Sequence, residues 1–245
     1  MTATVVLVHG AWHGAWCWER VVAGLEGDGI PVVAVDLPGH GASTEPLGDL
    51  FGDVAHVRGV LDGIKGPVLL VGHSYGGAVI TGAGDHPAVA RLVYVTAFNV
   101  AEGETVAAAG TDLPGIGDID HSGRPSLGGA MQFSDDGVVT FNPAMAREIF
   151  YNDCTEADAA AATAQLGPQP AASFAQAPAS IGWRTTPSTY VVCTDDMAVH
   201  PDLQRLLATR CSHVEELATD HSPFLSMPAE LTALLAEGAR ALAQT

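Results

Sequence analysis

The sequence predicts an α/β fold in which helices flank a mostly parallel central sheet and a mainly helical cap is inserted. Short runs of Val, Leu and Ile alternate with helix-length amphipathic segments; the runs span residues 4–9, 31–36, 67–72, 91–97, 188–193 and, with a weaker pattern, 213–217. These runs are continuously apolar, which is typical of parallel strands covered on both faces. The alternation of strand and helix patterns indicates an open sheet that binds ligands at the carboxyl ends of its strands.

The regular alternation stops between residues 100 and 182. This region is rich in Ala, Gly and Pro, with helical patterns only at 143–151 and 155–166. It is too long for an ordinary connection between two elements. We therefore expect a core made of residues 1–99 and 183–245 and a cap subdomain made of residues 100–182.

Composition and charge exclude several classes of protein. The chain has 245 residues, of which 47% are apolar and 16% charged, so we expect one globular unit. With 28 acidic residues against ten Lys and Arg, its net charge of −18 repels nucleic acids and anionic membranes. The same charge disfavours a highly anionic substrate, although the field inside a pocket can differ from the global one.

The N-terminal residues carry no signal-type pattern and no apolar run reaches the ~18 residues that span a bilayer. A cytoplasmic protein is expected, and the sequence leaves monomer and homodimer open. The four cysteines have neither metal-site nor redox-pair spacing and are interpreted as packing residues. No cofactor and no metal site are expected.

The stretch VGHSYGG, residues 71–77, contains the pattern G-x-S-x-G with Ser74 at its centre. Glycines on both sides allow a tight turn that projects the serine, and the following helix start stabilises negative charge. Such a pentapeptide can arise by chance in a glycine-rich chain. The strand pattern before it and the helix pattern after it favour a nucleophile.

A serine nucleophile needs a base, and ten histidines compete for this role. His221 follows the last strand pattern and precedes the last helix pattern, so it is expected at the same sheet edge as Ser74. The order Ser, Asp, His along the chain is the order that α/β-hydrolases use. The alternative is a loop histidine that caps the final helix.

The acid that orients the base is expected in the loop after the strand at 188–193. Asp195 and Asp196 both lie there, and their position alone does not decide between them. Asp220 adjoins His221, but neighbouring side chains rarely face each other, so a loop or capping role is favoured. Asp202 is interpreted as a first-turn helix residue.

Two backbone N–H groups could stabilise the oxyanion. The first strand ends in a histidine-glycine turn, which can direct the N–H of Ala11 at the site. The second donor would belong to Tyr75, the residue after the nucleophile. Each such donor contributes roughly 3–4 kcal/mol to transition-state stabilisation.

Together, VLVHGAWHGAWCW, DLPGHG, VGHSYGG and DHSPFLSMPAEL resemble the α/β-hydrolase superfamily, and within it the branch of plant methyl-salicylate esterases, hydroxynitrile lyases and bacterial pyrethroid hydrolases. The resemblance covers residues 4–99 and 183–243 and is weaker in the cap. In this branch the acid lies five residues before a proline that opens the next helix. Counting back from Pro201 gives Asp196. His200 departs from the apolar or proline residue common at its position.

The resemblance also implies which reaction to expect. The lyases of this branch have a lysine after the base histidine and a threonine in the first oxyanion loop. Here these positions hold Ser222 and Ala11, and the only lysine is Lys65. Hydrolysis of a small carboxylic ester therefore fits better than cyanide release. A lactonase, a C–C hydrolase, a hydroxynitrile lyase and a non-catalytic small-molecule receptor remain alternatives on this fold.

An apolar pocket for an apolar or aromatic acyl group is expected beneath the cap. Candidate lining residues share large or aromatic side chains in the expected cap or near its mouth: Trp12, His13, Met131, Phe133, Phe150 and Trp183. At helical spacing such residues are more often subdomain core than ligand contacts.

Overall fold

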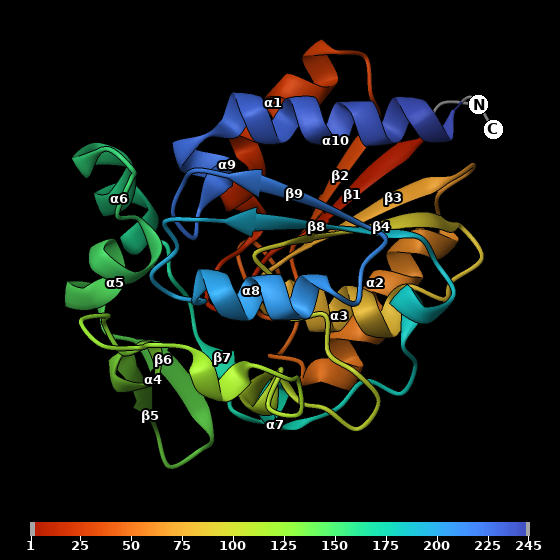
Figure 1. Ribbon diagram of the computed structural model, residues 1–245. Helices are drawn as coiled ribbons and strands as arrows, with labels where there is room; N and C mark the ends of the chain where they lie inside the picture. The colour runs from red at the N-terminus through yellow and green to blue at the C-terminus, as the bar shows by residue number, and fades with distance from the viewer. Residues whose placement is uncertain (1–2, 244–245) are drawn as a thin grey trace.

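A computed structural model describes residues 3–243, and its centre is a six-stranded sheet (Figure 1). The strands run in the order β2-β1-β3-β4-β8-β9, and every neighbouring pair is parallel. They are β1 (Thr4–Val8), β2 (Val32–Val35), β3 (Val68–His73), β4 (Val89–Val95), β8 (Ser188–Cys193) and β9 (His213–Leu217). The predicted fold class is confirmed: a mostly parallel sheet with helices on both faces.

Helices cover both faces of this sheet. They are α1 (Glu19–Gly27) and α10 (Pro228–Leu242) on one face, and α2 (Leu50–Asp62), α3 (Gly76–Ala83) and α8 (Pro201–Ala208) on the other (Figure 1). In β1, Val5 and Leu7 pack in the cluster beneath α1 and α10, whereas Val6 and Val8 pack in the cluster against α2 and α3. Because successive side chains point to opposite faces, both faces need apolar residues. This explains the continuous apolar runs.

Residues 100–182, the segment expected to form the cap, contain strands as well as helices. Its elements are the short 3-10 helices η2 (Val106–Ala108) and η3 (Ile116–Asp118), α4 (Leu127–Ala130), β5 (Met131–Phe133), β6 (Val138–Phe141), α5 (Pro143–Phe150), α6 (Glu156–Thr163), β7 (Gln169–Pro170) and α7 (Ala172–Ala175). The strands form an antiparallel sheet in the order β5-β6-β7. Helical residues outnumber strand residues in this segment, as the sequence predicted. The short strands were not expected, because strands of two to four residues leave almost no periodicity to detect.

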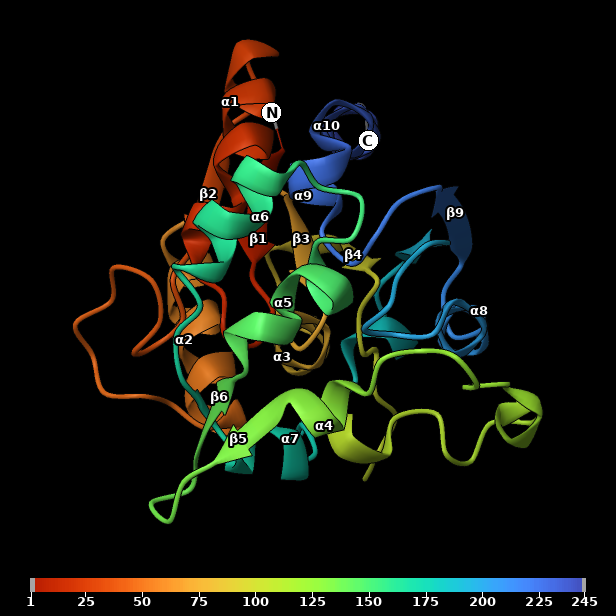
Figure 2. The same ribbon diagram turned by 90° about the vertical axis from the view of Figure 1, so that its left-hand side faces the viewer.

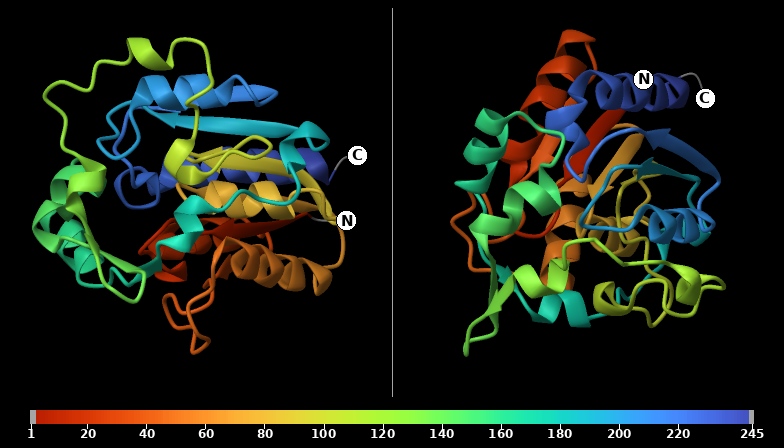
Figure 3. Two further views of the ribbon diagram at one scale, coloured as in Figure 1. Left: turned by 90° about the horizontal axis from the view of Figure 1, so that it is seen from below. Right: turned by 60° about the vertical axis from the view of Figure 1, so that its left-hand side comes forward.

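The cap lies beyond the carboxyl ends of the central strands. Figure 2 shows α5 and α6 in front of the sheet end, and Figure 3 shows them opposite the end where β1 begins and α10 finishes. Several hydrogen bonds tie this segment to the loops that follow core strands. Gly167 N–H donates to Trp12 O (2.7 Å), Asp153 N–H to the Asp220 carboxylate (2.9 Å) and the Asn152 amide to Asp195 O (3.1 Å). No helix within residues 3–243 is both long and apolar enough to cross a membrane.

Candidate active site

Ser74 lies on a sharp turn between β3 and α3. Its φ of 52° falls in the left-handed region, which non-glycine residues rarely adopt. The flanking glycines are required by close backbone approaches. A Cβ at Gly72 would lie 2.5 Å from Gly76 O, and a Cβ at Gly76 would lie 2.6 Å from His9 O. The turn therefore needs glycine on both sides of the serine.

The Ser74 hydroxyl faces a cavity and has no hydrogen-bond partner among residues 3–243. Ala11 and Tyr75 line the same cavity. Their backbone N–H groups donate no hydrogen bond within the described chain, so both remain available to an oxyanion. The expected nucleophile and the two expected donors thus lie around one space.

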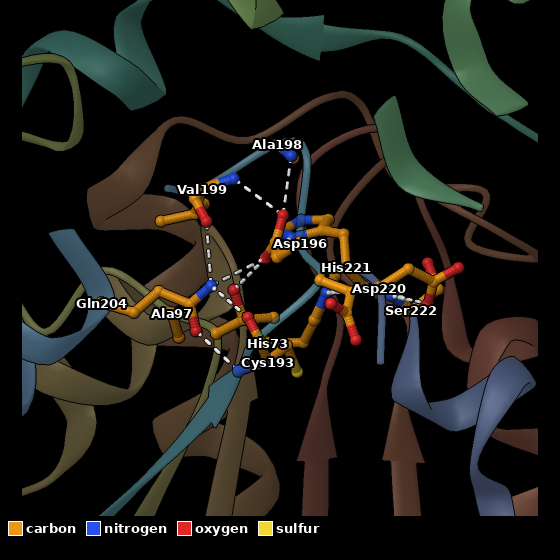
Figure 4. A network of polar contacts seen from close by, with 12 residues as sticks. His73, Ala97, Cys193, Asp196, Ala198, Val199, Gln204, Asp220, His221 and Ser222 are labelled. Carbon is orange, nitrogen blue, oxygen red and sulfur yellow. Dashed lines mark hydrogen bonds and ion pairs between the residues drawn. The ribbon is translucent and has the colours of Figure 1, made fainter. Parts of the chain in front are cut away.

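His221 and Asp196 form a direct, buried contact. His221 Nδ1 lies 2.7 Å from Asp196 Oδ2, and the two side chains are 2% and 0% exposed (Figure 4). His221 lies in the loop after β9, and Asp196 in the loop after β8. Neighbouring strands bring these loops together although 25 residues separate them in the chain.

The Asp196 carboxylate accepts hydrogen bonds on both oxygens (Figure 4). The donors are Ala198 N–H (2.6 Å) and Val199 N–H (2.9 Å) on Oδ1, and the Thr96 hydroxyl, the Gln204 amide (3.1 Å) and the His221 ring (2.7 Å) on Oδ2. Charge-assisted bonds of this kind stabilise a buried carboxylate. They also fix the orientation of the oxygen that His221 contacts.

Asp195, the other candidate acid, is exposed. Its backbone is nevertheless held in place, since its N–H donates to Thr219 O (3.0 Å) and its carbonyl accepts from Asn152. The two adjacent carboxylates therefore occupy different environments, and only that of Asp196 contacts His221.

Asp220 has a tethering role instead. Its Oδ1 accepts from Ser222 N–H (3.0 Å) and the Ser226 hydroxyl (2.8 Å), and its Oδ2 accepts from Asp153 N–H (2.9 Å). This buried carboxylate joins the loop that carries His221 to the cap. The arrangement agrees with the loop role favoured from its position.

Two aromatic rings enclose His221. The Phe150 ring stacks on it at 5.5 Å between centroids, and the His73 ring lies 4.6 Å away. His73 Nε2 donates to the His221 carbonyl (2.8 Å). Burial, with the charges of His221 and His13, holds the pKa of His73 well below its usual range, so this ring stays neutral. His73 thus supports the backbone of the candidate base.

The cavity has a volume of about 730 Å³, and Trp12, Met131 and Phe133 line it as expected. His13, Phe150 and Trp183 differ from the expectation, because they lie outside the lining. His13 is buried, with Nε2 2.9 Å from the Tyr151 hydroxyl, and burial lowers its pKa to about 4. Phe150 stacks on His221, and Trp183 donates to Val100 O (3.0 Å).

Several site residues escaped the sequence analysis. Thr96 and Gln204 hold the Asp196 carboxylate, and Phe98 and Arg124 line the cavity. Gln204 offered one signal, since it is an amide on the buried face of a helix directly after the acid loop. No group of three or more His, Cys, Asp or Glu side chains in the described residues is arranged to hold a metal ion.

The chain is similar to a hydrolase family and to proteins named as esterases. A model described as the alpha/beta hydrolase family matches residues 5–234. A carbendazim hydrolyzing esterase from Nocardioides sp. (strain SG-4G) is 41% identical over 112 residues, 43% of this chain and 46% of that protein. The putative chloroplastic methylesterase 13 of Arabidopsis thaliana is 26% identical over 249 residues, 96% of this chain and 56% of that protein. The chain thus spans about half the length of these curated relatives.

Among solved structures, a pyrethroid hydrolase from Sphingobium faniae JZ-2 is 28% identical, with a TM-score of 0.84 and 100% of both chains covered. Polyneuridine aldehyde esterase, at 20% identity and a TM-score of 0.84, shares the fold.

Proposed function

Because the chain belongs to the alpha/beta hydrolase family, we propose that it is a serine esterase that cleaves small carboxylic esters with an apolar or aromatic acyl group. The observation that carries the proposal is the buried 2.7 Å contact between His221 Nδ1 and Asp196 Oδ2. The strained turn that projects Ser74 into the cavity supports it. The relatives named as esterase, methylesterase and pyrethroid hydrolase support the same reaction class.

The proposed reaction begins with attack of Ser74 Oγ on the ester carbonyl carbon. His221 takes the hydroxyl proton, and Asp196 fixes the tautomer of the ring and stabilises the imidazolium. The N–H groups of Ala11 and Tyr75 bind the oxygen that becomes negative. His221 then protonates the leaving alcohol, which releases it and leaves an acyl-serine.

In the second half of the proposed reaction, His221 removes a proton from water, and the resulting nucleophile attacks the acyl-serine carbonyl. Collapse of this intermediate returns the proton to Ser74 and releases the carboxylic acid. Every group needed is a side chain or backbone amide of this chain, so the proposed reaction uses no cofactor.

Hydroxynitrile lyase chemistry is the nearest alternative on this site. Ser222 follows the candidate base and is fully buried, and no lysine lines the cavity. The lysine of those lyases has no counterpart in the lining, and the arginine that is present, Arg124, bonds the Asp196 carbonyl, so ester hydrolysis is favoured. A receptor that binds a small molecule without turnover is the alternative from another class.

Activity-based labelling and steady-state kinetics test the proposal. The wild-type chain should react with a fluorophosphonate probe at Ser74 and hydrolyse p-nitrophenyl or methyl esters. Ser74→Ala should abolish both, whereas Ser126→Ala, which removes another hydroxyl from the cavity lining, should retain both. Label on another residue would refute the nucleophile. Tight ligand binding without serine-dependent turnover would favour the receptor.

We also propose a domain organisation, a location and an oligomeric state for this protein. Residues 100–182 would act as a cap over the core formed by residues 1–99 and 183–245. We propose a cytoplasmic location and a monomer or homodimer, which size-exclusion chromatography with light scattering would distinguish.

A further inference from the structure

Arg124 is a cation in the cavity lining that has no carboxylate partner. Seven arginines of the described chain form ion pairs with Asp or Glu: Arg20, Arg58, Arg147, Arg184, Arg205, Arg210 and Arg240. Arg124 forms none within residues 3–243, although the chain has 28 acidic residues. In such an acidic protein an unpaired, half-buried arginine needs an explanation.

The contacts of Arg124 hold its guanidinium beside the acid loop. Its Nη2 donates to the backbone carbonyl of Asp196, and the backbone N–H of Arg124 donates to His121 O (3.4 Å). A guanidinium has five N–H donors in a planar fork. The Asp196 carbonyl uses one of these donors and leaves the fork largely free for a ligand.

The surroundings do not neutralise this charge. The cavity lining includes no Asp or Glu, and its other titratable side chains besides Tyr75 are His121 and His200, with ring centroids 5.3 Å apart. His200 Nε2 donates to Asp120 O (3.2 Å) and its Nδ1 accepts from Asp202 N–H (3.1 Å). Burial and, next, the charge of Arg124 lower the pKa of His200, which favours the neutral ring.

The acidic side chains of the adjoining loops have other partners, and the Asp196 carboxylate accepts the hydrogen bonds described above. The Asp120 carboxylate accepts from Ser122 N–H (2.9 Å), and the Asp202 carboxylate pairs with Arg205 (3.0 Å). Neither residue belongs to the cavity lining. Solvent and salt screen the many surface carboxylates beyond about 8–10 Å. The cavity lining therefore carries a guanidinium and no carboxylate, although the whole chain is strongly negative.

We propose that the cavity takes an ester that carries a free carboxylate remote from the scissile bond, with Arg124 binding that carboxylate through its fork. This inference rests on the esterase function proposed above and narrows its substrate class to monoesters of dicarboxylic acids. A single arginine in a lining without carboxylates matches a monoanion. The apolar side chains of Trp12, Met131 and Phe133 match the hydrocarbon between the two acid groups.

The test compares two esters of equal shape. Monomethyl adipate carries a carboxylate where methyl 6-methylheptanoate carries an isopropyl group. Arg124→Gln keeps an amide donor but has no charge, and Arg124→Lys keeps the charge without the fork. Arg124→Gln should lower the ratio of kcat/KM for monomethyl adipate to that for the neutral ester on the order of tenfold, mainly through KM. Arg124→Lys should restore part of the ratio.

Equal losses on both esters in Arg124→Gln would overturn the inference, because they would assign Arg124 to support of the Asp196 loop alone. An Arg124→Gln variant as active as the wild type on both esters would overturn it too, while Ser74-dependent turnover of the neutral ester would leave the esterase function standing.

Calorimetry in the Ser74→Ala background separates binding from chemistry. There, Arg124→Gln should raise the Kd of monomethyl adipate about tenfold even if no ester were turned over. If this binding were observed but the wild-type chain hydrolysed no ester, the esterase function would be refuted and the carboxylate site would stand. A Kd that does not depend on Arg124 would refute the site.

Discussion

The two adjacent carboxylates of the acid loop differ completely in environment. Asp196 is buried and contacts His221 at 2.7 Å, whereas Asp195 is exposed. Asp196→Asn should therefore lower kcat about 10³–10⁴-fold, because an amide at this position favours the wrong tautomer of the imidazole. Asp195→Asn should change kcat only a few-fold. Steady-state kinetics on one p-nitrophenyl ester measures both, and the opposite ranking would show that the other aspartate is the acid.

Gln204 should stabilise the protein as well as the site. Its side chain is fully buried and bonds the Cys193 N–H (2.8 Å) and carbonyl (3.1 Å) in addition to Asp196. Gln204→Leu leaves these groups buried without partners, so the free energy of unfolding should fall by about 2–3 kcal/mol. Urea denaturation measures the change. The matched control is Gln165→Leu on the surface, which should shift it by less than about 0.5 kcal/mol.

Asp53 should make stability depend on pH in the direction opposite to most carboxylates. It is buried and accepts from the Tyr75 hydroxyl at 2.6 Å. Burial raises the pKa of Asp53 to about 7, and the charge of Asp49 adds to this effect. The hydrogen bond from Tyr75 lowers the pKa, but by less than burial raises it. In the unfolded chain the pKa is near 4, so between about pH 4 and 7 the unfolded state binds fewer protons. The contribution of Asp53 to stability is therefore full below pH 4 and is lost as the pH rises to 7.

Asp53→Asn removes this titration and keeps an acceptor for Tyr75. The variant should gain stability relative to the wild type as the pH rises from 4 to 7, and the difference should level off above pH 7. Urea denaturation at several pH values, with both proteins in the same buffers, measures the difference. A difference that does not vary with pH would show that Asp53 is ionised throughout this range.

The glycines of the serine turn should be irreplaceable. An alanine Cβ at Gly76 would lie 2.6 Å from His9 O and 2.7 Å from Val8 O, both backbone atoms of the core. Gly76→Ala should lower the unfolding free energy by several kcal/mol and abolish fluorophosphonate labelling. Gly59→Ala, in α2 with nothing within 4 Å of the added Cβ, should raise it by up to about 1 kcal/mol. Thermal unfolding of the pair separates steric conflict from loss of glycine as such.

The sequence predicted the sheet because its signal is local. The six apolar runs became the six core strands, and the family match confirms the resemblance carried by the motifs. Side-chain direction is not local, however. Trp12 and His13 are neighbours, yet Trp12 lines the cavity while His13 binds Tyr151 in the interior. Thr96 lies 100 residues from the carboxylate that it supports, and only the assembled sheet brings the two residues together.

The outermost position of β9 has a consequence for how the protein would lose activity. The acid loop and the histidine loop are joined by two backbone bonds, from Thr194 N–H to Leu217 O (2.9 Å) and from Asp195 N–H to Thr219 O (3.0 Å). β9 pairs with one neighbour only and is mostly exposed. Peeling of this edge strand would separate His221 from Ser74 while the interior sheet remains folded. Catalytic inactivation in mild denaturant should then precede global unfolding, with amide hydrogen exchange fastest along β9.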